Sequence, residues 1–176
     1  MKHIMISVRP EWVCKILNRE KTLEIRNSVP KEVLNGEECL AEIYCTKGGK
    51  HLAYDEFSEI IDMPKYTLLS KRYTPCLNGK VVARFTLKKV DKIEICDPYV
   101  FRNGEQEDWW YFEKNACLTC EQMMEYIGYG EDHDGWDKKY DTGYAWHTDN
   151  LIIYDKPKSL EEFGVKRPFQ SWGYIE

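Results

Sequence analysis

The sequence predicts a single α+β domain that spans residues 1–176. Several segments have the period of strands, few have the period of helices, and the two kinds do not alternate regularly as they do in a doubly wound sheet. A chain of 176 residues has the length expected of one domain with its own core. We expect strands at 2–8, 21–26, 39–45, 80–95, 144–153 and 169–175, and helices near 10–18 and 119–127.

The first strand is followed by a helix that begins at Pro10. Proline is suited to the first turn of a helix, where its missing N–H would have no partner in any case. The apolar residues after it recur at helical spacing and give the helix one apolar side. They are Trp12, Val13, Ile16 and Leu17.

The strand at 21–26 carries the first candidate site. Leu23 and Ile25 alternate with polar residues, which is the period of a half-buried strand. Two interpretations are open: the polar residues form a solvated strand face with weak surface pairing, or they hold an anion or the edge of a base. These polar residues are Lys21, at the mouth of the strand, and Thr22, Glu24 and Arg26 on one face.

The middle of the chain contains the strongest strand signal. Residues 80–95 are rich in Val, Ile and Phe, and Asn78-Gly79 before them indicates a hairpin entry. Residues 39–45 predict another strand, and residues 56–61 a short helix.

Residues 97–142 are expected to be an acidic insertion, because they open with Asp97-Pro98 and carry the acidic excess of the chain. Within them, Thr119 is a helix N-cap with Gln122 as its capping-box partner, and Gly128 ends the helix. Strand signals return at 144–153 and 169–175.

Charge is distributed unevenly along the chain, whose net charge is -5. Residues 1–35 hold seven basic and four acidic residues, whereas residues 104–141 hold eleven acidic and three basic residues, a net charge of -8. We expect the two regions to occupy different surfaces, so that a nucleic acid would meet the first and avoid the second. This favours single-stranded RNA or a nucleotide over a long duplex. A protein partner that docks on the acidic insertion is a further hypothesis.

The composition also excludes several classes of protein. No window approaches 18 apolar residues, so no membrane span is expected, and the N-terminus lacks the apolar region of a signal peptide. Seven cysteines without a secretory context are expected to be reduced thiols. We therefore expect a cytoplasmic protein.

No metal or cofactor is expected. Cys117 and Cys120 form half of a zinc pattern, but a zinc site needs four ligands and no second pair with suitable spacing follows. Residues 131–134 are rich in oxygen ligands but lack the spacing of a calcium loop.

Aromatic residues near the C-terminal end are candidates for stacking on a base. Tyr144 and Trp146 would share one strand face, and Trp172 has Gln170 and Ser171 beside it to meet a base edge. The alternative is that each tryptophan is a core residue, which is the commoner fate of a tryptophan on a strand.

The run that ends at Arg26 resembles the signature of the ASCH family, in the PUA-like superfamily, which reads Gly-x-Lys-x-x-Glu-x-Arg. Lys21, Glu24 and Arg26 match, and Arg19 stands where the family has glycine. The preceding element of the family matches at Pro10, Ile16 and Leu17, and residues 144–147 and 168–174 resemble phage- and prophage-type members.

This resemblance implies a PUA-like, partly closed β-barrel of about six strands, with flanking helices and the signature strand at its mouth. It also implies that RNA, a nucleotide or a modified base binds in a cleft there. Lys21 and Arg26 would contact phosphate, Glu24 a base or ribose donor, and an aromatic residue such as Trp146 would stack. The expected ligand-binding residues are Arg9, Lys21, Glu24, Arg26, Tyr144, Trp146, Gln170, Ser171 and Trp172.

The alternative function is a hydrolase, of the amidohydrolase or ribonuclease type, that acts on a modified nucleoside or RNA. Some small ASCH proteins hydrolyse acetylated cytidine with a threonine nucleophile activated by lysine. Here Glu24 stands in the place of that threonine, so the covalent route does not carry over. Lys21 and Glu24 would then be the catalytic acid–base pair that activates water.

Overall fold

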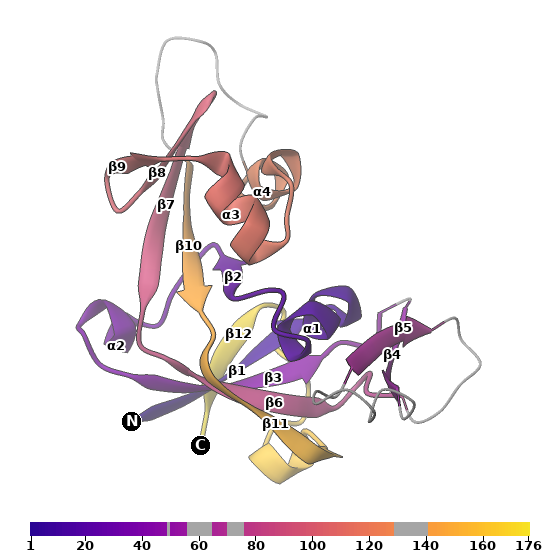
Figure 1. Cartoon of the computed structure of the whole chain (residues 1–176). Coiled ribbons are helices and arrows are strands. Elements are labelled where there is room, and N and C mark those ends of the chain that lie inside the picture. Colours follow the sequence, from indigo (N-terminus) through magenta and orange to yellow (C-terminus); the bar gives the residue numbers. More distant parts are fainter. Residues whose placement is uncertain (49, 56–64, 70–75, 129–140) are drawn as a thin grey trace.

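The computed structural model describes residues 1–48, 50–55, 65–69, 76–128 and 141–176. These residues form two five-stranded sheets, a two-stranded hairpin and four α-helices, which confirms the α+β class (Figure 1). The expected helix at 56–61 and the oxygen-rich run at 131–134 lie outside this description. The strands are β1 Lys2–Val8, β2 Leu23–Arg26, β3 Cys39–Cys45, β4 His51–Asp55, β5 Lys65–Leu69, β6 Val81–Leu87, β7 Val90–Cys96, β8 Tyr99–Arg102, β9 Glu105–Glu107, β10 Asp141–His147, β11 Asp149–Lys158 and β12 Trp172–Ile175. The helices are α1 Pro10–Leu17, α2 Lys31–Leu34, α3 Trp109–Ala116 and α4 Cys120–Ile127, and a 3-10 turn covers Glu161–Phe163.

The first sheet has the strand order β11-β6-β3-β1-β12. β1 and β3 pair in parallel, and the other pairs are antiparallel. Because β12 pairs with β1, the two ends of the chain lie close together on this sheet (Figure 1). The bounds of β1 and β3 are those expected from the sequence, whereas β12 begins three residues later than expected.

The second sheet has the order β2-β10-β7-β8-β9 and is antiparallel throughout. β2, the strand of the family-like signature, is at its edge. β8 and β9 lie within the expected insertion, so the insertion extends this sheet and is not separate from the fold.

Two long segments connect the sheets, and both were expected to be single strands. The segment predicted at 80–95 is β6 in the first sheet and β7 in the second, and the segment predicted at 144–153 is β10 and β11. Each bends where it passes from one sheet to the other (Figure 1). Strand-like periodicity continues through such a bend, so the sequence pattern does not reveal it. The described strands therefore form two sheets with separate edges in place of one barrel of about six strands.

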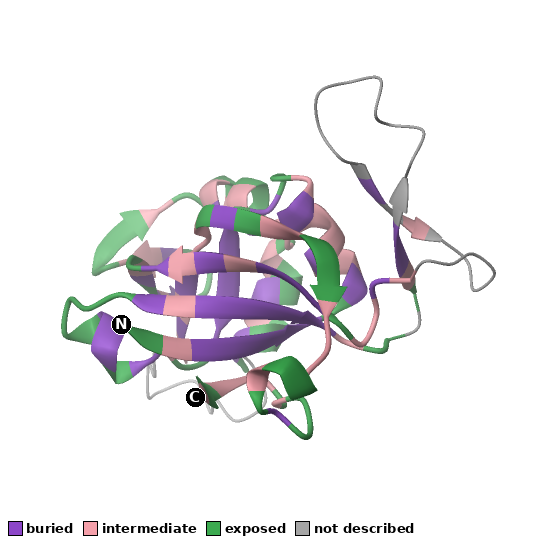
Figure 2. Ribbon diagram, turned by 90° about the horizontal axis from the view of Figure 1, so that it is seen from below, coloured by how far each residue is buried: buried purple, intermediate pink, exposed green. Residues whose placement is uncertain are grey.

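Each sheet has its own apolar core. Val13, Ile16 and Leu17 of α1 pack on the first sheet, as their helical spacing predicts. α3 and α4 pack on the second sheet through Phe112, Met123 and other apolar residues. Buried residues follow the middle of the strands and exposed residues lie toward the ends and on the outer helices (Figure 2).

The helices of the insertion differ in how well the sequence predicts them. In α4, Thr119 and Gln122 form the predicted capping box, and Gly128 ends the helix in the left-handed region. α3 was not predicted. Its N-cap is Asp108, whose side chain accepts a hydrogen bond from the Trp110 backbone N–H. No helix in the described part of the chain is long and apolar enough to cross a membrane.

The turn before β2 is made without the family's glycine. Arg19 adopts φ = 60°, the left-handed conformation that glycine takes at least cost. The backbone N–H groups of Arg19 and Glu20 bond back to the carbonyls of Ile16 and Lys15. The tight turn therefore forms at this position even though arginine is strained there.

Candidate functional site

A cleft of about 650 Å³ lies beside β2. Its size is in the range of small-molecule and nucleotide sites. Six of the nine predicted ligand-binding residues line it: Arg9, Lys21, Glu24, Arg26, Gln170 and Ser171. The other lining residues are Ser7, Val8, Trp12, Ile25, Thr46, Leu118, Gln122, Glu125 and Tyr126.

Three charged side chains, which we call the cleft triad, lie at the floor: Lys21, Glu24 and Arg26. Alternation along β2 turns Leu23 and Ile25 into the core of the second sheet and leaves Glu24 and Arg26 on the opposite face. Arg26 Nη2 lies 2.9 Å from Glu24 Oε1, and Lys21 Nζ lies 3.4 Å from Glu24 Oε2. The sequence spacing thus brings all three side chains together.

The cleft triad is buried. Lys21, Glu24 and Arg26 are only 2%, 6% and 5% exposed, so the interpretation of a solvated strand face is wrong. Buried charges are costly unless they are paired and hydrogen-bonded. Here Glu24 pairs with both Lys21 and Arg26, and the two basic side chains also donate hydrogen bonds to backbone carbonyls.

Lys21 is held by the segment that follows α3. Its Nζ donates a hydrogen bond of 2.6 Å to the carbonyl of Ala116. Burial lowers the pKa of Lys21, and the charge of Glu24 opposes this effect. The amine is therefore closer to its neutral form than an exposed lysine would be, which is the condition for acting as a base.

Arg26 connects β2 to both ends of the chain. Its Nη2 donates to the Ser7 carbonyl at 2.9 Å, and its Nη1 donates to Ser171 Oγ at 3.1 Å. The guanidinium therefore joins the end of β1 to the segment before β12 across the cleft floor.

Two polar atoms of the cleft triad have no hydrogen-bond partner among the described residues. They are Glu24 Oε2, which has only the ion pair with Lys21, and Arg26 Nε. Most buried polar side-chain atoms are hydrogen-bonded, so a carboxylate oxygen held only by a long ion pair distinguishes Glu24 from most buried polar groups.

The walls of the cleft carry aromatic residues that the sequence analysis did not assign to a site. Trp12 on α1 is partly buried, with Lys21 Nζ at 5.6 Å and Lys15 Nζ at 5.9 Å from its ring centroid. Tyr126 on α4 is 42% exposed. The helical spacing of Trp12 places it beside the core residues of α1. Only its position at the edge of the apolar side of this helix could have indicated that it also lines the cleft.

The acidic insertion forms one wall of the cleft, which corrects the expectation that it and the basic first 35 residues occupy different surfaces. Leu118, Gln122, Glu125 and Tyr126 all line the cleft. Met123 and Ile127 anchor α4 in the core of the second sheet, and this packing brings the helix alongside β2.

The predicted stacking residues do not line the cleft. Trp146 has no exposed surface and belongs to the core of the first sheet, so it cannot receive a base without disrupting that core. Trp172 packs edge-on against it at 5.7 Å between ring centroids and donates a hydrogen bond from Nε1 to Ser28 Oγ. Tyr144 packs against the same core. The alternation that places Tyr144 and Trp146 on one face is correct, but that face meets the core.

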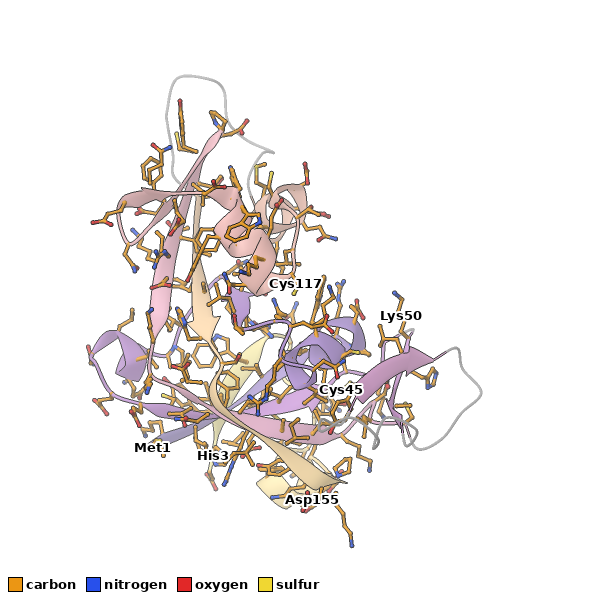
Figure 3. The ribbon with its side chains drawn as sticks, in the orientation of Figure 1. Met1, His3, Cys45, Lys50, Cys117 and Asp155 are labelled. Atoms are coloured by element: carbon orange, nitrogen blue, oxygen red, sulfur yellow. The ribbon has the colours of Figure 1, made fainter. Side chains whose placement is uncertain are left out.

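Cys117 and Cys120 form no metal-ligand cluster with other residues that the structure describes. Figure 3 shows Cys117 at the end of α3, on the side toward α1, and its Sγ lies 3.5 Å from the Glu20 carbonyl. Among the described residues, no three histidine, cysteine or acidic side chains are arranged to hold a metal ion.

The fold matches solved structures of an ASCH protein. The chain aligns with the crystal structure of ASCH from Zymomonas mobilis over 99% of its own length and 88% of that chain, with a TM-score of 0.54 and 15% sequence identity. A serine-to-alanine variant and a tyrosine-to-phenylalanine variant of that protein align with TM-scores of 0.56 and 0.57, also at 15% identity. At this identity the likeness establishes a common fold and nothing about activity. No protein-family model and no curated protein matches the chain.

Proposed function

We propose that this protein binds single-stranded RNA or a nucleotide in the cleft beside β2. The observation that carries the proposal is the cleft triad: three charged side chains are buried at the floor, and among the described residues Glu24 Oε2 has only the ion pair with Lys21, at 3.4 Å. An exocyclic amine of a base or a ribose hydroxyl is a suitable donor for it.

The structure supports different roles for the basic residues from those expected. Lys21 and Arg26 share the carboxylate of Glu24 and donate to backbone carbonyls, so both side chains are held inside the protein. Arg9 is exposed where it lines the cleft, and its charge is available to a phosphate. Trp12 and Tyr126 replace the predicted tryptophans as aromatic surfaces for the base.

The test is a fluorescence-anisotropy titration of a short single-stranded RNA and of a duplex DNA at several salt concentrations. Stacking contributes about 1–3 kcal/mol per base, so Trp12→Ala should weaken RNA binding by at least about fivefold. Trp110→Ala is the matched control, because Trp110 is 61% exposed and does not line the cleft.

Two outcomes would contradict the proposal. One is equal affinity of the wild type and Trp12→Ala for the RNA. The other is tight binding of duplex DNA with a steep salt dependence, equivalent to about six phosphate contacts.

A hydrolase is the second candidate function, and the lowered pKa of Lys21 favours it. Lys21 and Glu24 would activate a water molecule for attack on the amide of a modified nucleoside or on RNA. Release of acetate from N4-acetylcytidine by the wild type, and its loss in Lys21→Met, would establish this activity. If neither the nucleoside nor RNA is turned over, the hydrolase hypothesis is wrong and binding remains the proposed function.

The finer family assignment belongs to the same proposal. The signature residues Lys21, Glu24 and Arg26 and the common fold support membership of the ASCH family, and residues 144–147 and 168–174 suggest a phage- or prophage-type member. A cytoplasmic location and a protein partner on the acidic insertion are proposed from the sequence alone. The protein partner is tested with a variant that carries charge reversals at Glu105 and Glu113, both of which are exposed. This variant should capture the partner more weakly than the wild type.

A further inference from the structure

The cleft contains the free edge of the second sheet. β2 is the edge strand, and Glu24, Ile25 and Arg26 line the cleft in succession. Successive side chains of a strand point to opposite faces, and Ile25 indeed packs in the core of the second sheet while Glu24 and Arg26 lie on the other face. Residues from both faces therefore meet one cleft, which means that the cleft extends around the edge of β2.

The hydrogen-bond pattern shows which backbone groups face this edge. The His147 N–H bonds to the Lys89 carbonyl, on the side of β10 away from β2. In an antiparallel ladder the direction alternates along the strand, so Ala145 also faces β7, whereas Trp146 faces β2. Ile25 is the register partner of Ala145. The Ile25 N–H and C=O therefore point away from β10, toward the cleft.

These two backbone groups have no partner in the described part of the chain. Among residues 1–48, 50–55, 65–69, 76–128 and 141–176, no hydrogen bond beyond the β2–β10 ladder involves the Ile25 N–H or C=O. Ile25 is also 3% exposed, so its backbone has little contact with bulk water. Buried backbone donors and acceptors are almost always paired, and an unpaired one costs free energy comparable to a lost hydrogen bond.

We propose that the Ile25 N–H and C=O bind the Watson–Crick edge of a nucleobase in the cleft. Each base presents a hydrogen-bond donor next to an acceptor on that edge, which complements the two groups of one peptide residue. Trp12 and Tyr126 on the walls fit the faces of a planar ring, and Glu24 Oε2 lies on the same floor. The inference rests on the proposed nucleotide-binding function and assigns the main contact to the backbone.

The geometry favours a small planar ligand over an added peptide strand. Of the four residues of β2, only Leu23 and Ile25 have backbone N–H and C=O groups that point away from β10. Leu23 does not line the cleft. Strand addition depends on a row of backbone hydrogen bonds, and here the cleft offers the groups of one residue.

The test replaces one backbone N–H by an ester oxygen. Residues 1–38 are synthesised with the Ile25 amide changed to an ester and joined to residues 39–176 by native chemical ligation at Cys39, so that every side chain is retained. The control carries the ester at Leu23. Like Ile25, Leu23 is a buried residue of β2 whose backbone groups point away from β10, but it does not line the cleft. Binding of AMP, CMP, GMP and UMP to the full-length proteins is measured by calorimetry.

We expect the Ile25 ester to weaken binding by about five- to tenfold, the equivalent of one hydrogen bond, and the Leu23 ester to change it less than about twofold. A nucleotide methylated on the nitrogen of its Watson–Crick edge should bind wild type and Ile25 ester equally. Wild-type binding that is unaffected by the Ile25 ester overturns this inference and leaves the proposed function intact. Failure of the wild type to bind any of the four nucleotides or the short single-stranded RNA overturns both.

Discussion

The second sheet carries a buried ionic cluster on each face, and the two clusters differ in how completely they are hydrogen-bonded. On one face lies the cleft triad. On the other lies what we call the Asp91 network, formed by Asp91, Arg102, Asn103 and His147. Glu24 and Asp91 are both at most 6% exposed, so burial does not distinguish them.

Asp91 has a partner for each carboxylate oxygen. Asn103 Nδ2 donates to Oδ1 at 2.9 Å, and His147 Nε2 lies 2.9 Å from Oδ2. Burial alone would raise the pKa of Asp91, but the hydrogen bonds from His147 and Asn103 hold it below its ordinary value. Arg102, which also pairs with Glu107, completes a network that ties β7, β8 and β10 together.

The comparison separates a structural role from a binding role. A carboxylate whose oxygens are both matched by the protein has nothing left to offer a ligand, whereas Glu24 keeps one oxygen unmatched at the floor of a cleft. We therefore expect changes in the Asp91 network to affect stability alone and changes in the cleft triad to affect both stability and binding.

The largest effect on stability is expected from Glu24→Ala. It leaves Lys21 and Arg26 buried without their counter-charge, and breaking a buried ion pair in this way costs about 3–5 kcal/mol of unfolding free energy. Urea unfolding measures it. Glu37→Ala, at an exposed acid, is the control and should stay within about 0.5 kcal/mol of the wild type. A loss below about 1 kcal/mol for Glu24→Ala would contradict the buried triad.

A smaller effect is expected from Asp91→Asn. The change removes a charge but keeps the shape, and hydrogen bonds to a charged group contribute about 1–3 kcal/mol. RNA binding should be unchanged, because the Asp91 network does not line the cleft. If Asp91→Asn lowers the affinity for RNA as much as a cleft-triad variant does, the assignment of a purely structural role to the Asp91 network is wrong.

The same variant tests the pH dependence. Because the pKa of folded Asp91 lies below the unfolded value of about 3.9, its contribution is fully present above that value. The contribution is lost as the pH falls through the folded pKa. The difference in unfolding free energy between the wild type and Asp91→Asn should therefore be constant near pH 5 and shrink below about pH 4.

The smallest effect is expected from Arg19→Gly in the turn that delivers Lys21. Relief of the left-handed arginine is worth about 1 kcal/mol, and the greater freedom of glycine in the unfolded chain offsets about half of it. The long hydrogen bond from Arg19 Nη2 to the Leu151 carbonyl, at 3.3 Å, is also lost, but Arg19 is exposed and water replaces the bond at little cost. We expect a net gain of about 0.5 kcal/mol in thermal or urea unfolding.

Glu20→Gly is the control for this turn, since Glu20 is not among the residues with positive φ. Glycine there should destabilise the protein by about 0.5–1 kcal/mol. Equal destabilisation by both substitutions would show that Arg19 is not strained.

Local patterns predicted the parts of the fold that depend on near neighbours. The alternation in 21–26 placed Glu24 and Arg26 on one face, and Thr119 with Gln122 marked the start of α4. In contrast, Trp146 lies on the face that its alternation predicts, yet no local pattern indicates whether that face meets a cleft or a core. The answer depends on the first sheet, which is distant in sequence.

The insertion was the hardest part to place for the same reason. The residues of α3, Trp-Trp-Tyr-Phe at its start, are aromatic residues that strands also favour, so the helix was missed. The acidic charge of the insertion suggested a separate surface. Packing of Met123 and Ile127 on the second sheet outweighs that long-range charge effect and brings α4 to the cleft.

One wall of the cleft comes from α4 of the insertion, whereas the floor comes from β2, so the wall and the floor can change independently in evolution. The floor is built from β2 and the turn before it, where Lys21 and Arg26 donate to backbone carbonyls and both pair with Glu24. The wall at Gln122, Glu125 and Tyr126 consists of exposed residues on one helix, and Met123 and Ile127 keep that helix in place whatever its outer residues are. Substitutions on that surface change the lining of the cleft without disturbing the triad. A chain with the same floor can therefore acquire a differently lined cleft by changing a few residues of α4.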